Sequence, residues 1–431
     1  MIRSLFTSMQ ALSKGARRPA SEPESRVKTL GLLGAGFMGA GIAYVSARAG
    51  IDVVLIDRDM ESAERGKAHA ARLMDREIDK GRATAADRQS VLTRITPAVD
   101  YDRLAPCDLV IEAVFEDRDL KAEVLPRAEG QIAPNAILAS NTSTLPITGL
   151  AASITRPEQF IGIHFFSPVD KMQLVEIILG RDTAPSALAR ALDYVRQIRK
   201  TPIVVNDSRG FYTSRVVMTY IAEGHHMLDE GVPAALIENA GRMAGMPVGP
   251  LALNDEVALD LSWKILQATK KDVDEAYEPR PIDRILEELV VNRGRFGRKN
   301  AKGFYDYPAE GRKRLWLGIS EVAAPGENGF DVERLKERLL LIQALETARC
   351  FAEGVLTDVR EADVGAILGF GYAPFTGGPL SFIDTVGPAA FVDKCKAYAD
   401  ELGPRYQPPD LLLDMGKAGD GFYRRFPPAA A

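Results

Sequence analysis

The chain has 431 residues, of which 46% are hydrophobic and 26% are charged, and its formal net charge is −5. This length accommodates two or three domains, and the composition is that of a soluble globular protein. The weak negative charge argues against nucleic acid as a partner, and no apolar run approaches the ~20 residues of a membrane span. The three cysteines, Cys107, Cys350 and Cys395, are far apart. Their spacing indicates a reducing compartment and predicts neither a disulfide framework nor a metal site.

The first 26 residues form a segment of their own. From Met1 to Ala20 the segment carries basic residues but no acidic one, and its apolar residues have helical spacing. A mitochondrial transit peptide has this composition, and so does a short amphipathic helix followed by a linker. The residues alone leave both interpretations open.

Residues 27-206 alternate short apolar runs with polar helical stretches, which predicts a doubly wound α/β domain of Rossmann type. Near-continuous apolar runs are typical of parallel strands that are covered on both faces. The predicted strands are Leu30–Leu33, Val53–Ile56, Leu109–Ala113, Ala136–Ala139, Ile161–Phe166, Leu174–Leu179 and Ile203–Val205.

A glycine-rich turn follows the first of these strands. Gly34 allows a sharp turn out of the strand, Gly36 allows the backbone to approach a pyrophosphate, and Gly39 allows the next helix to pack close to the sheet. The phosphates then lie at the helix N-terminus. Asp57, at the end of the second strand, is placed to accept hydrogen bonds from the adenosine ribose and to repel a 2′-phosphate. The pattern therefore predicts an NAD site.

After Gly210 the strand pattern ends and long helical segments begin. One unit occurs twice: an acidic-Gly-Val turn is followed about twenty residues later by Gly-Pro-Leu and then by an aspartate. We interpret this as a duplication that forms an all-α C-terminal half of two similar units. The predicted domains are a linker-like helical extension at 1-26, the NAD-binding domain at 27-206, and helical domains at 207-310 and 325-431.

Two ionisable residues interrupt neighbouring apolar strands. His164 lies near the carboxyl end of one strand, where open α/β sheets bind ligands, and Glu176 interrupts the next. Taken alone, His164 is equally well explained as a hydrogen-bonded core histidine. A buried carboxylate needs a partner, however, so we expect the two side chains to meet. The imidazole could then take a proton from a substrate hydroxyl as hydride leaves for NAD.

Other polar residues follow the remaining strands. The run of hydroxyls from Ser140 to Thr144 could bind a substrate oxygen or the nicotinamide end of the cofactor, or it could simply cap a helix. Glu116 and Lys121 lie beyond another strand end, and on their own they are ordinary loop charges.

Together these segments resemble the 3-hydroxyacyl-CoA dehydrogenase family, in the family's order and over most of the chain. The resemblance implies NAD-dependent oxidation of L-3-hydroxyacyl-CoA to 3-oxoacyl-CoA in fatty-acid β-oxidation, with substrate between the Rossmann-type domain and the helical half. The matching motifs are Leu33-Gly-Ala-Gly-Phe-Met-Gly39, Ser140-Asn-Thr-Ser143, His164-Phe-Phe-Ser-Pro168, Leu174-Val-Glu-Ile-Ile178, Gly210-Phe-Tyr212 and Gly294-Arg-Phe-Gly-Arg-Lys-Asn-Ala-Lys-Gly-Phe-Tyr305.

The resemblance also implies roles for single residues. His164 is the expected catalytic base and Glu176 its partner, while Ser143 contacts both the substrate oxygen and NAD. Ser214 stands where many members have an asparagine that binds the substrate carbonyl, which puts its role in doubt. The expected NAD contacts are Gly34, Gly36, Met38, Gly39, Asp57, Glu116, Lys121, Ser143 and Ser167.

The opening segment resembles the linker helix between the hydratase and dehydrogenase halves of multifunctional members. We therefore favour the helix-and-linker interpretation and a cytoplasmic location over the mitochondrial matrix. The chain would be a dehydrogenase half without a hydratase, acting on acyl-CoA as a monomer or homodimer, with an enoyl-CoA hydratase or thiolase as a possible partner. The alternatives are a short-chain 3-hydroxybutyryl-CoA dehydrogenase and a non-catalytic acyl-CoA- or NAD-binding component of a larger complex.

Overall fold

The computed structural model describes residues 2–273, 278–326 and 329–428. Met1 of the predicted extension, residues 274–277 of the predicted first helical domain, and residues 327–328 and 429–431 of the predicted last domain lie outside the described residues. The contacts divide the chain into two compact units. Unit 1 consists of Met1–Arg215, Cys350–Phe370 and Phe422–Ala431, and unit 2 consists of Val216–Arg349 and Gly371–Gly421. This division does not test the bounds of the four predicted domains, which stay a prediction.

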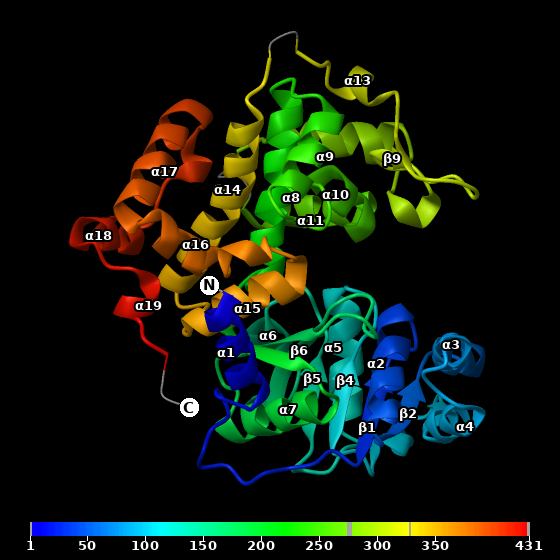
Figure 1. The fold of residues 1–431 in the computed structure, drawn as a ribbon. Coiled ribbons are helices and arrows are strands. Elements are labelled where there is room, and N and C mark those ends of the chain that lie inside the picture. Colours follow the sequence, from blue (N-terminus) through cyan, green and yellow to red (C-terminus); the bar gives the residue numbers. More distant parts are fainter. Residues whose placement is uncertain (1, 274–277, 327–328, 429–431) are drawn as a thin grey trace. The chain divides into compact units, whose positions relative to one another are not determined.

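Unit 1 contains an eight-stranded sheet of order β3-β2-β1-β4-β5-β6-β7-β8 (Figure 1). This is the predicted Rossmann-type arrangement, in which the strand order reverses between β1 and β4. The strands are β1 (Thr29–Leu33), β2 (Asp52–Ile56), β3 (Ile95–Ala98), β4 (Leu109–Glu112), β5 (Ile137–Ser140), β6 (Phe160–Phe165), β7 (Leu174–Leu179) and β8 (Thr201–Asn206).

Two features of the sheet differ from the sequence prediction. Strand β3 was missed, because it is a four-residue edge strand that contains Pro97, and proline weakens a strand pattern. Strand β7 runs antiparallel to β6, whereas the apolar runs predicted parallel strands. The eight residues between β6 and β7 are too few for the crossover that a parallel pair needs. This antiparallel register places His164 directly opposite Glu176.

Helices cover both faces of the sheet. One face forms the main core with α2, α3 and α7, where residues such as Ile42, Leu73 and Leu192 are buried. On the other face, Gly365 of α15 packs against Ile203, and Ile147 of α6 packs against Gly162. The helices of unit 1 are α1 (Ile2–Ser13), α2 (Phe37–Arg48), α3 (Met60–Asp79), α4 (Ala85–Thr93), α5 (Arg118–Glu129), α6 (Ile147–Ala151), α7 (Pro185–Gln197), α15 (Val359–Phe370) and α19 (Phe422–Arg425).

Unit 2 is helical apart from a short hairpin of β9 (Tyr305–Asp306) and β10 (Arg314–Leu315). The helices α8 and α14 begin or end in unit 1 and lie mostly in unit 2. The remaining helices are α8 (Thr213–Asp229), α9 (Ala234–Met243), α10 (Pro250–Val257), α11 (Leu259–Val273), α12 (Pro281–Leu286), α13 (Ile319–Val322), α14 (Val332–Ala352), α16 (Pro379–Val386), α17 (Pro388–Leu402) and α18 (Asp410–Ala418).

The two Gly-Pro-Leu segments adopt the same local structure. Each starts an eight-residue helix, α10 or α16, with glycine at the N-cap and proline at the first helical position. Each helix ends at a residue with positive φ, Ala258 at φ 84° and ψ 120° and Gly387 at φ 89° and ψ 126°. These matches support the predicted duplication.

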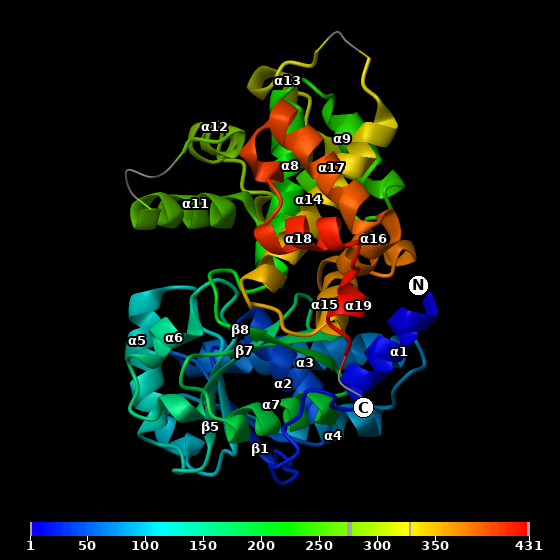
Figure 2. The ribbon, with the colours of Figure 1, turned by 90° about the vertical axis from the view of Figure 1, so that its left-hand side faces the viewer.

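The opening segment is part of unit 1. Helix α1 packs against α15 and β8 (Figure 2), and Leu12 is buried there. The Arg18 guanidinium donates to both carboxylate oxygens of Asp193 on α7, at 2.8 and 3.0 Å, and to three backbone carbonyls. Asp193 also accepts from the N–H and hydroxyl of Ser25. The mostly buried ion pair between Arg18 and Asp193 thus attaches residues 13–27 to the Rossmann-type domain.

None of the helices within the described residues is both long enough and apolar enough to cross a bilayer.

The variant D193N tests the attachment of the opening segment. Removing one partner of a mostly buried ion pair should lower the free energy of unfolding by about 2–4 kcal/mol at pH 7, measured by urea denaturation. Burial opposes ionisation of Asp193, but Arg18 and Ser25 outweigh it and hold the pKa of Asp193 below its ordinary value. Its contribution is therefore present above pH ~4 and lost as the pH falls through the folded-state pKa.

The matched control is D75N, because Asp75 pairs with Arg88 on the exposed surface and should contribute less than about 1 kcal/mol. Equal effects of D193N and D75N at pH 7 would contradict the attachment.

Candidate functional site

The glycine-rich turn between β1 and α2 has the geometry of a dinucleotide cradle. Gly34 has φ 98°, and a Cβ on Gly39 would lie 1.8 Å from the carbonyl oxygen of Gly34. Neither position therefore tolerates a side chain. At Gly36, by contrast, a Cβ would point into open space, and no side chain caps the start of α2. The backbone is thus open where a pyrophosphate would approach the helix N-terminus.

Asp57 lies beside this turn, as predicted. Its Oδ2 accepts from the N–H of Ala35 at 2.7 Å and its Oδ1 from the N–H of Arg58 at 2.8 Å. Each carboxylate oxygen can accept a second hydrogen bond. Asp57 can therefore hold the turn and a ribose hydroxyl at the same time.

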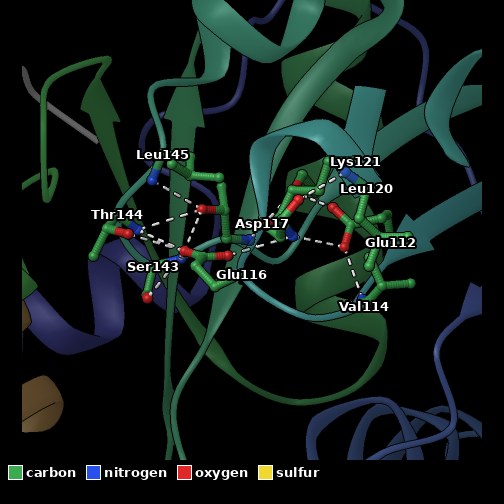
Figure 3. Close-up of polar contacts among 11 residues, drawn as sticks. Glu112, Val114, Glu116, Asp117, Leu120, Lys121, Ser143, Thr144 and Leu145 are labelled. Carbon is green, nitrogen blue, oxygen red and sulfur yellow. Dashed lines mark hydrogen bonds and ion pairs between the residues drawn. The ribbon is translucent and has the colours of Figure 1, made fainter. Parts of the chain in front are cut away.

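A second cluster, which we call the Glu112 network, joins the ends of β4 and β5 to the start of α5 (Figure 3). Glu112 and Lys121 have no exposed side-chain surface and form an ion pair of 2.7 Å. Glu112 also accepts from the hydroxyl of Ser140 at 2.6 Å and from the N–H of Val114 at 2.8 Å. Lys121 lies 3.3 Å from Glu116, so its ammonium stands between two carboxylates.

Glu116 holds the run of hydroxyls that follows β5. Its Oε1 accepts from the Thr142 hydroxyl at 2.6 Å and from the N–H groups of Ser143 and Thr144 at 3.0 and 3.1 Å (Figure 3). Burial opposes ionisation, but Lys121 and these hydrogen bonds outweigh it, so the pKa of Glu116 lies below its ordinary value. The charged carboxylate thereby fixes the backbone that carries Ser143.

His164 and Glu176 meet as the sequence predicts. The His164 Nδ1 lies 2.9 Å from the Glu176 Oε2, and both side chains are buried. The carboxylate also accepts from the N–H groups of Tyr212 and Thr213, each at 3.1 Å, and from the Thr213 hydroxyl at 2.8 Å. An ionised carboxylate only accepts, so a neutral His164 donates from Nδ1 and keeps Nε2 free to accept a proton.

The structure thus gathers the predicted residues into three groups: the glycine turn with Asp57, Glu116 with Lys121 and Ser143, and His164 with Glu176. Asn141 links the second and third groups, because its side chain accepts from the N–H of Phe165 at 2.8 Å. Met38 lies in the first turn of α2. Ser167 is exposed after β6, and Ser214 is half-buried in the first turn of α8. Within the described ranges, neither of these serine hydroxyls bonds another candidate residue.

Sequence reasoning missed Glu112 and Thr213. Glu112 interrupts the apolar strand β4 near its carboxyl end, which is the signal that identified His164 and Glu176, so the same criterion applied to β4 would have found it. Thr213 had no such signal, because it belongs to an ordinary helix start and its importance depends on the tertiary contact with Glu176.

The comparisons with known proteins show the family of this chain. The chain matches the model described as "3-hydroxyacyl-CoA dehydrogenase, NAD binding domain" over residues 29–208. It matches "3-hydroxyacyl-CoA dehydrogenase, C-terminal domain" over residues 210–307. The chain belongs to the 3-hydroxyacyl-CoA dehydrogenase family. The predicted family, the Rossmann-type fold with a helical C-terminal part, and NAD as the cofactor are confirmed.

A "Fatty acid oxidation complex subunit alpha" from Shewanella loihica is 36% identical to the chain, covering 98% of it. The chain spans 60% of that relative's length. The structure of 3-hydroxybutyryl-CoA dehydrogenase from Escherichia coli has a TM-score of 0.79 at 25% identity and covers 92% of this chain and 99% of its own. (S)-3-hydroxybutyryl-CoA dehydrogenase from Ralstonia eutropha is 38% identical with a TM-score of 0.60, covering 66% of this chain and 100% of its own.

The variant E112Q tests the Glu112 network in this 3-hydroxyacyl-CoA dehydrogenase family member. Neutralising Glu112 leaves a fully buried ammonium with only Glu116 as its counter-charge. The free energy of unfolding in urea should therefore fall by about 3 kcal/mol. The control is E123Q, because Glu123 pairs with Arg127 on the exposed face of the same helix at 3.5 Å and should contribute less than about 1 kcal/mol. A loss for E112Q no larger than that for E123Q would contradict the role assigned to the network.

Proposed function

We propose that this chain oxidises L-3-hydroxyacyl-CoA to 3-oxoacyl-CoA with NAD⁺, and that His164 is the general base oriented by Glu176. The observation that carries the proposal is the buried 2.9 Å contact between the His164 Nδ1 and the Glu176 Oε2, in a chain of this family. A paired histidine with a free Nε2 is suited to proton transfer near neutral pH.

In the proposed reaction, the His164 Nε2 accepts the proton of the 3-hydroxyl group. The nicotinamide ring of bound NAD⁺ supplies the acceptor for the hydride that leaves C3. The Ser143 hydroxyl, which donates to Glu116 at 3.3 Å in the structure, turns to donate a hydrogen bond to the substrate oxygen and keeps that oxygen facing His164. Glu176 stabilises the imidazolium that forms, and the proton then passes from His164 to solvent.

The proposed cofactor contacts follow the predicted set. Gly34, Gly36 and Gly39 form the cradle for the pyrophosphate, and Asp57 binds the adenosine ribose. Met38, Glu116, Ser143 and Ser167 contact the rest of NAD. Lys121 was also predicted to contact NAD, but its side chain has no exposed surface, so it acts on the cofactor through Glu116. Because Glu116 already binds the loop of Ser143, one carboxylate couples the cofactor site to the substrate site.

Ser214 takes the position of the usual asparagine and has a shorter side chain. We propose that its hydroxyl, half-buried at the start of α8, contacts the substrate carbonyl through a water molecule. Its contribution to turnover is then smaller than that of Ser143.

The wider context is also a proposal. The relatives named as subunits of a fatty acid oxidation complex favour a role in β-oxidation with an enoyl-CoA hydratase or a thiolase as a partner. We further propose a cytoplasmic location and a monomer or homodimer. The two structures named 3-hydroxybutyryl-CoA dehydrogenases favour a short-chain substrate as the second candidate. Rates measured against 3-oxoacyl-CoA of increasing chain length separate these two substrate preferences.

The variant H164Q tests the assignment of the base. Acetoacetyl-CoA reduction, followed by the absorbance of NADH, should fall by ~10²–10⁴-fold because the proton-transferring group is lost. NADH binding, followed by its fluorescence, should change little because His164 lies outside the cofactor cradle. H226Q is the control, since His226 lies on α8 in unit 2.

Full activity of H164Q would remove His164 from the mechanism. If the native chain binds NADH but turns over 3-oxoacyl-CoA of none of the chain lengths tested, the chain is a non-catalytic binding component instead.

A further inference from the structure

Thr213 supplies two of the four hydrogen bonds that hold the Glu176 carboxylate. Its N–H donates to Oε1 at 3.1 Å and its hydroxyl donates to Oε2 at 2.8 Å. The Oε2 atom is also the acceptor of the His164 Nδ1. Thr213 is 1% exposed, so water does not compete for its hydroxyl. The hydroxyl of Thr213 and the imidazole of His164 therefore share one carboxylate oxygen.

The position of Thr213 in the fold explains this arrangement. Thr213 is the first residue of α8, so its N–H is one of the groups that lack an intrahelical acceptor. These N–H groups and the helix dipole favour a negative charge at this end. Glu176 enters from β7 and accepts from the N–H groups of Tyr212 and Thr213. The start of α8 thus fixes the carboxylate from one side, and His164 of β6 binds it from the other.

We propose that Thr213 is a positioning residue for the dehydrogenase reaction. Its hydroxyl fixes the Glu176 Oε2 against His164 and limits how strongly Glu176 attracts the imidazolium. This inference rests on the proposed function of His164. When one carboxylate oxygen accepts two strong hydrogen bonds, it attracts each donor less strongly than it would attract that donor alone.

Other titratable groups around the pair have partners of their own. Glu361 of α15 accepts from the N–H of Val204 on β8 at 2.8 Å and lies 3.3 Å from Arg17. Burial raises the pKa of Glu361 to about 8. The Lys200 ammonium, directly before β8, donates to the carbonyl of Val169 in the connection from β6 to β7 at 2.7 Å. Burial lowers the pKa of Lys200 to about 8.

Two more groups lie on neighbouring elements. The Tyr212 hydroxyl donates to the carbonyl of Ala362 on α15 at 2.7 Å. On α7, Asp193 is held by Arg18 and Ser25. These groups are the same in the native protein, T213V and T213S. A difference in pH dependence between the two variants is therefore due to the Thr213 hydroxyl.

The test compares T213V, which removes the hydroxyl at nearly constant volume, with T213S, which keeps it. The pH dependence of kcat is measured for 3-hydroxybutyryl-CoA oxidation and for acetoacetyl-CoA reduction. Oxidation needs an unprotonated Nε2 and reduction needs a protonated one. Losing the hydroxyl strengthens the attraction of Glu176 for the imidazolium, so both midpoints should move to higher pH, by ~0.5–1 unit. KM for NAD should stay within about twofold, and T213S should restore the native profile.

T219V is the matched control on the same helix, because the Thr219 hydroxyl donates to the carbonyl of Val216 and not to Glu176. It should leave both midpoints unchanged. Unchanged midpoints in a folded T213V would overturn the proposal, and so would a shift of equal size in T219V. If T213V does not fold, T213A removes the same hydroxyl without adding a methyl group and carries the same expectation.

An NMR titration of the His164 ring without substrate separates this inference from the proposed function. The T213V substitution should move that titration to higher pH even if the native chain shows no turnover. A shift without turnover supports the effect of Thr213 on the His164–Glu176 pair and rejects the reaction. Turnover without a shift rejects Thr213 alone.

Discussion

The fully buried carboxylate of Glu176 is the constraint on which the site depends. A charge without contact to water is stable only when surrounding donors satisfy its oxygens. The donors at Glu176 come from β6 and from the start of α8. The antiparallel register of β6 and β7 brings the His164 imidazole to the carboxylate. The chain after Gly210 brings the N–H groups of Tyr212 and Thr213 and the Thr213 hydroxyl. The His164 imidazole is therefore held only when β6 and the start of α8 both contact the Glu176 carboxylate.

The Glu112 network satisfies another buried carboxylate, on β4, three strands away from β7 in the sheet. There the buried carboxylate is satisfied by Lys121, Ser140 and Val114, and Lys121 in turn lies next to Glu116. In both clusters a buried carboxylate on an apolar strand organises a neighbouring loop or helix start. The glycine turn differs, because its order comes from backbone geometry and close approach rather than from charge. The two charged clusters and the glycine turn thus lie at the same edge of the sheet, where α/β folds bind ligands.

Much of this could be predicted from local patterns. Seven strands, the glycine turn and the pairing of His164 with Glu176 followed from apolar runs and from the residues that interrupt them. Strand β3 was not predicted because Pro97 interrupts its apolar pattern. The direction of β7 depends on the length of the connection between β6 and β7 rather than on the residues of the strand. The contact of Glu116 with Ser143, the role of Thr213 and the packing of α15 onto the sheet of unit 1 arise only from tertiary structure. No local pattern encodes them.

The central claim is that Glu176 fixes His164 in the tautomer that leaves Nε2 free. Long-range ¹H–¹⁵N spectra of protein labelled at its four histidines distinguish the two ring nitrogens, and the spectrum of H164Q assigns the His164 signals by their loss. In the neutral His164 ring we expect a proton on Nδ1 and an unprotonated Nε2. A neutral ring that carries its proton on Nε2 would contradict it.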